Sequence, residues 1–368
     1  MSSLAPRLYE FIFCPLGFIY GAVVGSFLNV AIYRLPHERS LLHPPSHCPW
    51  CRTGLSWYDL VPLLSQVTLK ARCRYCGQRI AWRYFGVELF TAVSFALVVA
   101  TSRDPLLTLQ GLLLVAGLIC TFFIDYDHFI IPDEVNWTLA LGGLLPNLWL
   151  VFGSSTPGAG LSTVPLNPFG YASPTLVLPS ALLGAAVAGG TLLLVREFGQ
   201  LLFRKEAMGW GDVKLAAAVG ANLMAIGTLW EVLTFYLLSF LIGAVISVGL
   251  MLLAVLRQGR SLPVREVLIG GLVSFTVMIA LRALVAFATG VALGNEAAPA
   301  NSASETVWFG ALAAVVGVVI GLLAASRKLE RPPEYIPFGP MLAVGAYATW
   351  FLGPNLVVPF ARGLYTLR

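Results

Sequence analysis

The chain has 368 residues, of which 58% are hydrophobic and only 11% are charged. Soluble domains contain roughly 45–50% apolar and about 25% charged residues, so this composition excludes an ordinary soluble globular protein. The formal net charge is only +5, which is too small to indicate nucleic-acid binding.

Apolar stretches long enough to form membrane-spanning helices recur along nearly the whole chain, since about 20 helical residues cross the hydrocarbon layer of a bilayer. The first of them, 11–33, lacks the cleavage site of a signal peptide, so we expect it to remain as a membrane helix. The pattern predicts an all-α polytopic membrane protein with about ten transmembrane helices. The predicted helices are 11–33, 85–101, 106–124, 137–153, 176–195, 213–230, 232–256, 267–289, 306–325 and 339–354.

Basic residues are distributed unevenly between the two sides of these helices. They greatly outnumber acidic residues in 34–84, which is the Lys and Arg excess of a cytosolic loop and predicts that both termini lie outside. The remaining loops alternate in the same way. Loops without Lys or Arg, predicted outside, are 154–175 and 290–305, and basic loops, predicted inside, are 196–206, 257–265 and 326–331. The first outside loop is rich in Gly, Ser, Pro and Thr, which predicts a flexible connector.

Four of the six cysteines form two C-x-x-C pairs in the predicted cytosolic loop, Cys48 with Cys51 and Cys73 with Cys76. A reducing cytosol disfavours disulfides, and this spacing is typical of a zinc ribbon. A short loop with few aliphatic residues buries little core, so a bound metal would supply folding free energy. We predict a small cytosolic domain that resembles a zinc ribbon and holds structural zinc through the four thiolates. Redox-active or unligated cysteines are the alternatives.

Two acidic clusters fall at predicted cytosolic helix ends, one from Asp125 to Glu134 and the other around Asp212. Carboxylates at membrane depth are costly and are functional candidates by default. Asp133 and Asp212 could instead cap the helices that follow them. Gly209 and Gly211 favour a functional role for Asp212 over a helix cap. Glycine has no side chain, so another group can approach the backbone closely, and a plain cap does not need such an approach.

Two aspartates from different helices that meet at one site suit aspartyl proteolysis, because one can act as a base while the other acts as an acid. The Gly-x-Gly could also be part of a dinucleotide-binding fingerprint, but a third glycine and a preceding strand are missing. A secondary transporter would also carry essential aspartates, although near the midplane and within inverted repeats. A non-catalytic assembly scaffold would need the metal domain but not the glycines.

The chain as a whole resembles the prepilin peptidases, the type IV leader peptidases of bacterial inner membranes, which belong to the GxGD class of aspartyl proteases. The segments that carry the resemblance, in the family order, are 25–36, the two C-x-x-C pairs, 62–65, Arg83-Tyr84 with Glu88, 125–133, 209–215 and 336–340. The resemblance implies that Asp125 and Asp212 are the catalytic pair. The supporting residues that it implies are Asp127, Asp133, Gly209, Gly211 and Lys214.

The resemblance also implies a bifunctional enzyme. Such an enzyme cleaves the leaders of type IV prepilins and type II secretion pseudopilins on the cytosolic side, then N-methylates the new N-terminal residue with S-adenosylmethionine. The family assigns methylation to the cytosolic N-terminal loop, and Glu88 is a candidate for binding the cofactor. The alternative is that Glu88 is only a charge at the start of a helix, where it interacts with the helix dipole. The implied partners are the prepilin and pseudopilin substrates and the lipid bilayer, without nucleic acid. The implied location is the bacterial inner membrane, with the active site facing the cytosol.

The chain departs from the family pattern at two places. An extra pair of helices, about 267 to 325, is inserted before the Ile-Pro-Phe-Gly-Pro motif. Because two helices return the chain to the same side of the membrane, the topology is preserved. Tyr58-Asp-Leu-Val-Pro62 stands where the family has Asp-Asn-x-Pro, so an Asn that would serve methylation is missing, and a peptidase without methylation is the alternative. The predicted domains are a first helix (1–33), the zinc domain (34–84), the catalytic core (85–265), the extra hairpin (266–328) and the C-terminal part (329–368).

Overall fold

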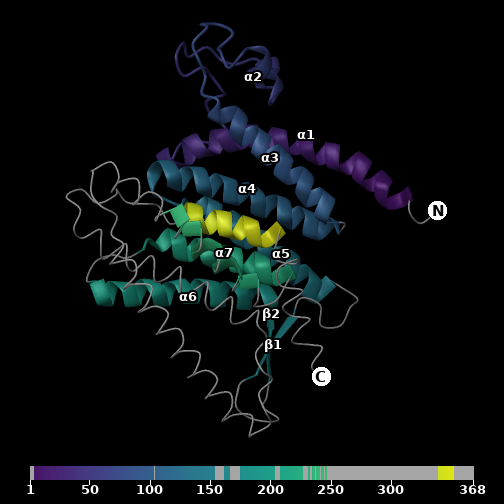
Figure 1. Cartoon of the computed structure of the whole chain (residues 1–368). Helices are drawn as coiled ribbons and strands as arrows, with labels where there is room; N and C mark the ends of the chain where they lie inside the picture. The colour runs from purple at the N-terminus through teal and green to yellow at the C-terminus, as the bar shows by residue number, and fades with distance from the viewer. Residues whose placement is uncertain are drawn as a thin grey trace, which may run out of the picture.

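The computed structural model of the chain describes residues 4–102, 104–153, 161–165, 175–203, 208–226, 339–351 and parts of 231–246. Long helices lie side by side in a bundle (Figure 1). They are α1 (Leu4–Arg34), α3 (Arg83–Thr101), α4 (Pro105–His128), α5 (Asp133–Gly153), α6 (Ser180–Phe203), α7 (Trp210–Ile226) and the helix 339–351, which is yellow in Figure 1.

Five of the described helices, α1, α3, α4, α5 and α6, are long and apolar enough to cross a membrane. Large apolar side chains such as Ile19, Phe27 and Trp149 remain exposed on these helices, as expected for side chains that contact lipid. The prediction of a mostly helical chain with several helices suited to spanning a membrane is therefore confirmed, and the count of about ten stays a prediction. The predicted helices 267–289 and 306–325, and most of 232–256, lie outside the described residues.

The segment between α5 and α6 was predicted to be a flexible connector outside the membrane, whereas the structure has strands in it. It contains two antiparallel strands, β1 (Leu161–Pro165) and β2 (Thr175–Pro179), paired in the register Leu161↔Pro179 to Pro165↔Thr175. β-Branched Val and Thr favour the extended backbone here. The predicted helix 176–195 consequently begins later, at Ser180, after the proline that ends β2.

Several helix ends differ from the predictions, and two of these differences concern the predicted catalytic aspartates. The helix predicted to end at 124 continues to His128, so Asp125 lies in the last turn of α4. The helix predicted to start at 213 begins at Trp210, so Asp212 lies inside the first turn of α7 rather than at its N-cap. Phe129, with a φ of 56°, ends α4 in the left-handed region and turns the chain into α5.

Residues between α1 and α3 form a small domain that projects from one end of this helix pair (Figure 1). Its short elements are η1 (Leu35–His37), η2 (Trp57–Leu60) and α2 (Leu64–Thr68). The α1 and α3 backbones that carry it pack closely, since a Cβ added at Gly25 would lie 2.7 Å from the Glu88 Cα. The Glu88 carboxylate also ties the domain to α3 by accepting a 2.8 Å hydrogen bond from the Leu63 amide.

Candidate functional site

The four predicted zinc ligands come together in the small domain. The sulfur atoms of Cys48, Cys51, Cys73 and Cys76 all lie within 4.8 Å of one another, and none forms a disulfide. The Cys48 and Cys76 Sγ atoms are 3.9 Å apart. Zinc–sulfur bonds of about 2.3 Å in a tetrahedron require sulfur atoms about 3.8 Å apart. The arrangement therefore fits a four-thiolate zinc site.

Each C-x-x-C pair folds into a turn of the same kind, and each turn aims its two sulfur atoms at a common centre. In each turn the first cysteine's amide donates to the carbonyl five residues later, and its carbonyl accepts from the amide four residues later. These bonds are Cys48 N to Thr53 O (3.0 Å), Arg52 N to Cys48 O (2.9 Å), Cys73 N to Gln78 O (2.9 Å) and Gly77 N to Cys73 O (2.9 Å). The side-chain and backbone hydrogen bonds of Thr53 lower the pKa of the Cys51 thiol to about 6, which favours the thiolate that binds metal.

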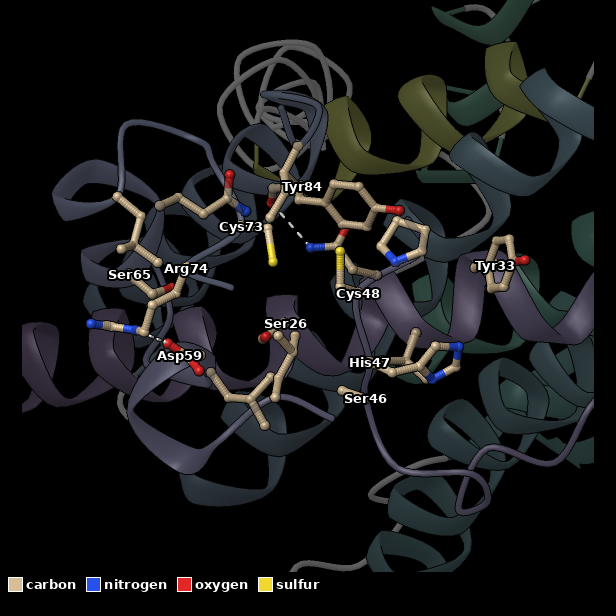
Figure 2. A pocket seen from close by; sticks show the side chains of 18 of the residues that line it. Ser26, Tyr33, Ser46, His47, Cys48, Asp59, Ser65, Cys73, Arg74 and Tyr84 are labelled. Atoms are coloured by element: carbon tan, nitrogen blue, oxygen red, sulfur yellow. Dashed lines mark hydrogen bonds and ion pairs between the residues drawn. The ribbon is translucent and has the colours of Figure 1, made fainter. Parts of the chain in front are cut away.

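A cavity of about 630 Å³ lies between this domain and the α1–α3 pair. Figure 2 shows Ser26 of α1, Asp59 of η2, Ser65 of α2 and Tyr84 of α3 around it, and Cys48 and Cys73 are also in its wall. The cysteine cluster and the cavity therefore share a wall, so the fold of the cysteine turns shapes the cavity.

Two carboxylates line the cavity, Asp59 and Glu88. Glu88 is 5% exposed and accepts hydrogen bonds from the Leu63 amide and the Ser26 side chain. Burial raises the pKa of Asp59, but hydrogen bonds from Arg74 (2.6 Å), Tyr75 and the Ser56 amide lower it further than burial raises it. Asp59 is therefore a fixed negative charge at the cavity wall.

The predicted catalytic aspartates are brought together at the end of the bundle next to this domain. Asp125 is 5% exposed and accepts a hydrogen bond from the Gly339 amide at the start of the helix 339–351. Asp212 accepts a hydrogen bond from the Gly209 amide, as an acidic side chain does at the third position of a helix. The two carboxyl groups are close enough to interact electrostatically. Two aspartates from α4 and α7 thus face one site.

Gly339 is a site residue that the sequence analysis did not identify. A Cβ added at Gly339 would lie 2.5 Å from the Asp125 Oδ2, so glycine is needed for the helix 339–351 to reach the carboxylate. The signal was present in the Ile-Pro-Phe-Gly-Pro motif, which matched the family without an assigned role. Of the two predicted glycines, Gly211 packs tightly, with an added Cβ 3.1 Å from the Ile131 Cβ, whereas Gly209 has room for one.

The three charged residues among the predicted supporting residues, Asp127, Asp133 and Lys214, form ion pairs that link neighbouring helices. Lys214 Nζ bonds both carboxylate oxygens of Asp133, at 2.7 and 2.9 Å, and links α7 to α5. Arg83 makes a two-pronged ion pair with Asp127, at 2.9 and 2.5 Å, and links α3 to α4. Both pairs are partly exposed, and such pairs contribute about 0–1 kcal/mol. We found no sequence signal that would have named Arg83 as the partner of Asp127.

Comparison with known proteins agrees with this arrangement. A family model for the bacterial peptidase A24 N-terminal domain matches residues 19–102, and a model for the type IV leader peptidase family matches residues 112–248. These two ranges contain the tetracysteine domain and both aspartates. No solved structure shows a significant match to the chain.

Similar curated proteins carry the name prepilin leader peptidase/N-methyltransferase. One from Myxococcus xanthus is 36% identical over 258 residues, which cover 70% of this chain and 68% of the relative. One from Aeromonas salmonicida is 34% identical over 278 residues, covering 68% and 86%, and one from Neisseria gonorrhoeae is 35% identical over 233 residues, covering 57% and 73%. The family models cover the four cysteines and both aspartates, and the relatives are at least 34% identical over most of the chain, so the chain belongs to the prepilin leader peptidase/N-methyltransferase family.

Proposed function

We propose that the chain is a bifunctional membrane enzyme. It cleaves the leaders of type IV prepilins and type II secretion pseudopilins, then methylates the new N-terminal amine. The observation that carries the peptidase activity is the meeting of Asp125 and Asp212, two carboxyl groups from different helices, each held by a backbone amide.

Hydrolysis at this site needs one ionised and one protonated aspartate, a state that two neighbouring carboxyl groups favour because both cannot easily be ionised. The ionised carboxylate takes a proton from water as the water oxygen bonds to the scissile carbonyl carbon. The protonated carboxyl gives its proton to the carbonyl oxygen. The tetrahedral intermediate then collapses. The peptide nitrogen takes the proton that the first aspartate removed from water and leaves as the new N-terminal amine, while a hydroxyl of the intermediate returns a proton to the other aspartate.

The peptidase proposal is tested with Asp125→Asn and Asp212→Asn proteins and a synthetic prepilin peptide. An amide can neither take up nor supply the proton, so each variant should insert normally and lose cleavage. Cleavage by Asp212→Asn at even a tenth of the wild-type rate would contradict the assignment.

For the second activity we propose that S-adenosylmethionine binds in the cavity between the small domain and the α1–α3 pair. A volume of about 630 Å³ lies within the roughly 300–1,000 Å³ usual for small-ligand sites. The Asp59 and Glu88 carboxylates suit the positive sulfonium and ammonium groups of this donor. Leu60, which stands at the Asn position of the family's Asp-Asn-x-Pro, lines the same cavity.

The donor proposal is tested by calorimetric titration of purified protein with S-adenosylmethionine. Wild-type protein should bind the donor, and Glu88→Gln should bind it more weakly. Absence of binding by wild-type protein, together with normal leader cleavage, would leave a peptidase without methylation.

The remaining features follow from this assignment. We propose structural zinc at the four cysteines, where it would hold the cavity wall in place. We also propose that the cysteine domain and the aspartates face the cytosol from the bacterial inner membrane, because the loop that carries the cysteines is strongly basic. Both termini would then lie outside, and 85–265 would be the catalytic core.

A further inference from the structure

Two polar side chains near the aspartates are buried without a hydrogen-bond partner. Thr121 of α4 is completely buried, and Asn136 of α5 is 5% exposed. Within the described part of the chain, the Thr121 hydroxyl and both polar atoms of the Asn136 amide have no partner. Leaving such groups unpaired costs stability, so each calls for an explanation.

The unpaired hydroxyl of Thr121 is unusual among the helical threonines that the structure describes. The hydroxyls of Thr91, Thr138 and Thr191 each donate a 2.7 Å hydrogen bond to the carbonyl four residues earlier. This is the common way to satisfy a threonine inside a helix. Because Thr121 does not use it, its hydroxyl is left without a hydrogen-bond partner inside its own helix.

Another buried asparagine shows how this fold treats a structural amide. The Asn222 Nδ2 donates to the Leu139 carbonyl at 2.7 Å and to the Ala218 carbonyl at 2.9 Å. Its Oδ1 lies 3.5 Å from the Gln110 Nε2. Asn222 therefore joins α4, α5 and α7, whereas Asn136 makes no such bond.

Helix geometry places Thr121 and Asn136 at one level, next to the aspartates. Thr121 precedes Asp125 by four residues and so lies on the same side of α4, one turn away. α4 and α5 run in opposite directions after the turn at 129–132, and they pack where a Cβ added at Gly117 would meet Leu139. Thr121 follows Gly117 by one turn and Asn136 precedes Leu139 by one turn, so both lie between this contact and Asp125.

We propose that Thr121 and Asn136 bind the backbone of the substrate next to the scissile bond. The proposal rests on the assignment of Asp125 and Asp212 as the catalytic pair. A peptide bond must leave a helix to be hydrolysed, and an unwound segment at membrane depth has amide and carbonyl groups that water cannot satisfy. The Asn136 amide offers both a donor and an acceptor, which matches one peptide unit, and the Thr121 hydroxyl offers either.

The test separates substrate binding from a structural role. Thr121→Val and Asn136→Leu remove the polar atoms while keeping similar shapes, and neither leaves a protein partner unsatisfied. Each should raise the KM for a synthetic prepilin peptide about tenfold, the equivalent of one hydrogen bond, without lowering the melting temperature. Thr121→Ser keeps the hydroxyl and should restore most of the affinity. Asn222→Leu, the matched control, should lower the melting temperature.

A binding measurement keeps the result independent of the catalytic assignment. Fluorescence anisotropy with a labelled peptide should show that Asn136→Leu weakens binding about tenfold in the Asp212→Asn background, where no cleavage is expected. If Asp212→Asn cleaves normally, the catalytic assignment fails. The two residues are then still tested by the KM values and by competition of unlabelled with labelled peptide, measured in the wild-type background. Unchanged KM and unchanged affinity in both variants would overturn the proposal. A lower kcat at constant KM, which indicates an interaction made only in the transition state, would also overturn it, as would a melting temperature lowered as in Asn222→Leu.

Discussion

Replacing Gly339 by alanine tests whether the helix 339–351 positions the Asp125 carboxylate. The new Cβ would lie 2.5 Å from the Asp125 Oδ2, whereas ordinary contacts begin at 3.4 Å, so the carboxylate must move by about 0.9 Å. A displacement of about 1 Å in a catalytic group can cost roughly 100-fold in rate. We therefore expect Gly339→Ala to lower kcat for leader cleavage on the order of 100-fold.

The fold should tolerate this change, because alanine is a better helix former than glycine and keeps the amide that bonds Asp125. Thermal unfolding of the variant should match that of the wild type, which separates a displaced carboxylate from a damaged protein. Gly142→Ala in α5 is the matched control, since its added Cβ comes no closer than 3.5 Å to any neighbour. The control should cleave normally. Cleavage by Gly339→Ala at more than a third of the wild-type rate would refute the reasoning.

Three further predictions concern the residues around this centre. Purified protein should contain about one zinc, and Cys73→Ser should lower the zinc content and increase proteolysis within 34–84; freshly purified wild-type protein without zinc would contradict the metal site. Glu88→Gln should cleave the leader but transfer labelled methyl groups poorly, and an equal loss of both activities would count against separate sites. Asp133→Asn breaks an exposed ion pair worth at most about 1 kcal/mol, so cleavage should stay within about fivefold of wild type; a loss as large as that of Asp212→Asn would place Asp133 in the chemistry.

Local patterns in the sequence were enough to predict the class of the protein and its chemistry. Hydrophobic segments of membrane-spanning length identified the helical membrane protein, because the bilayer imposes one length on every spanning helix. The two C-x-x-C pairs predicted a metal site, because ligand spacing within one turn is a local property. The aspartates were predicted as a pair from their residue types and flanking glycines.

Contacts between helices could not be predicted in the same way. The ion pair of Asp127 with Arg83 joins residues 44 positions apart, and only the packing of α4 against α3 brings them together. The β1–β2 pair was missed because its short segments were read as a connector by composition. Helix ends were missed by a few residues, since the last turn of α4 and the first turn of α7 depend on caps and neighbours.

Hydrophobicity and residue spacing along the chain are enough to predict a helical membrane protein with a tetracysteine loop and two acidic clusters, because both are local properties. That Asp125, Asp212 and Gly339 share one site, and that Glu88 and Asp59 line one cavity, follows only from how the helices pack. The reason is physical. Which faces of two helices meet depends on the packing of side chains from all the surrounding helices, and that packing is a property of the whole bundle.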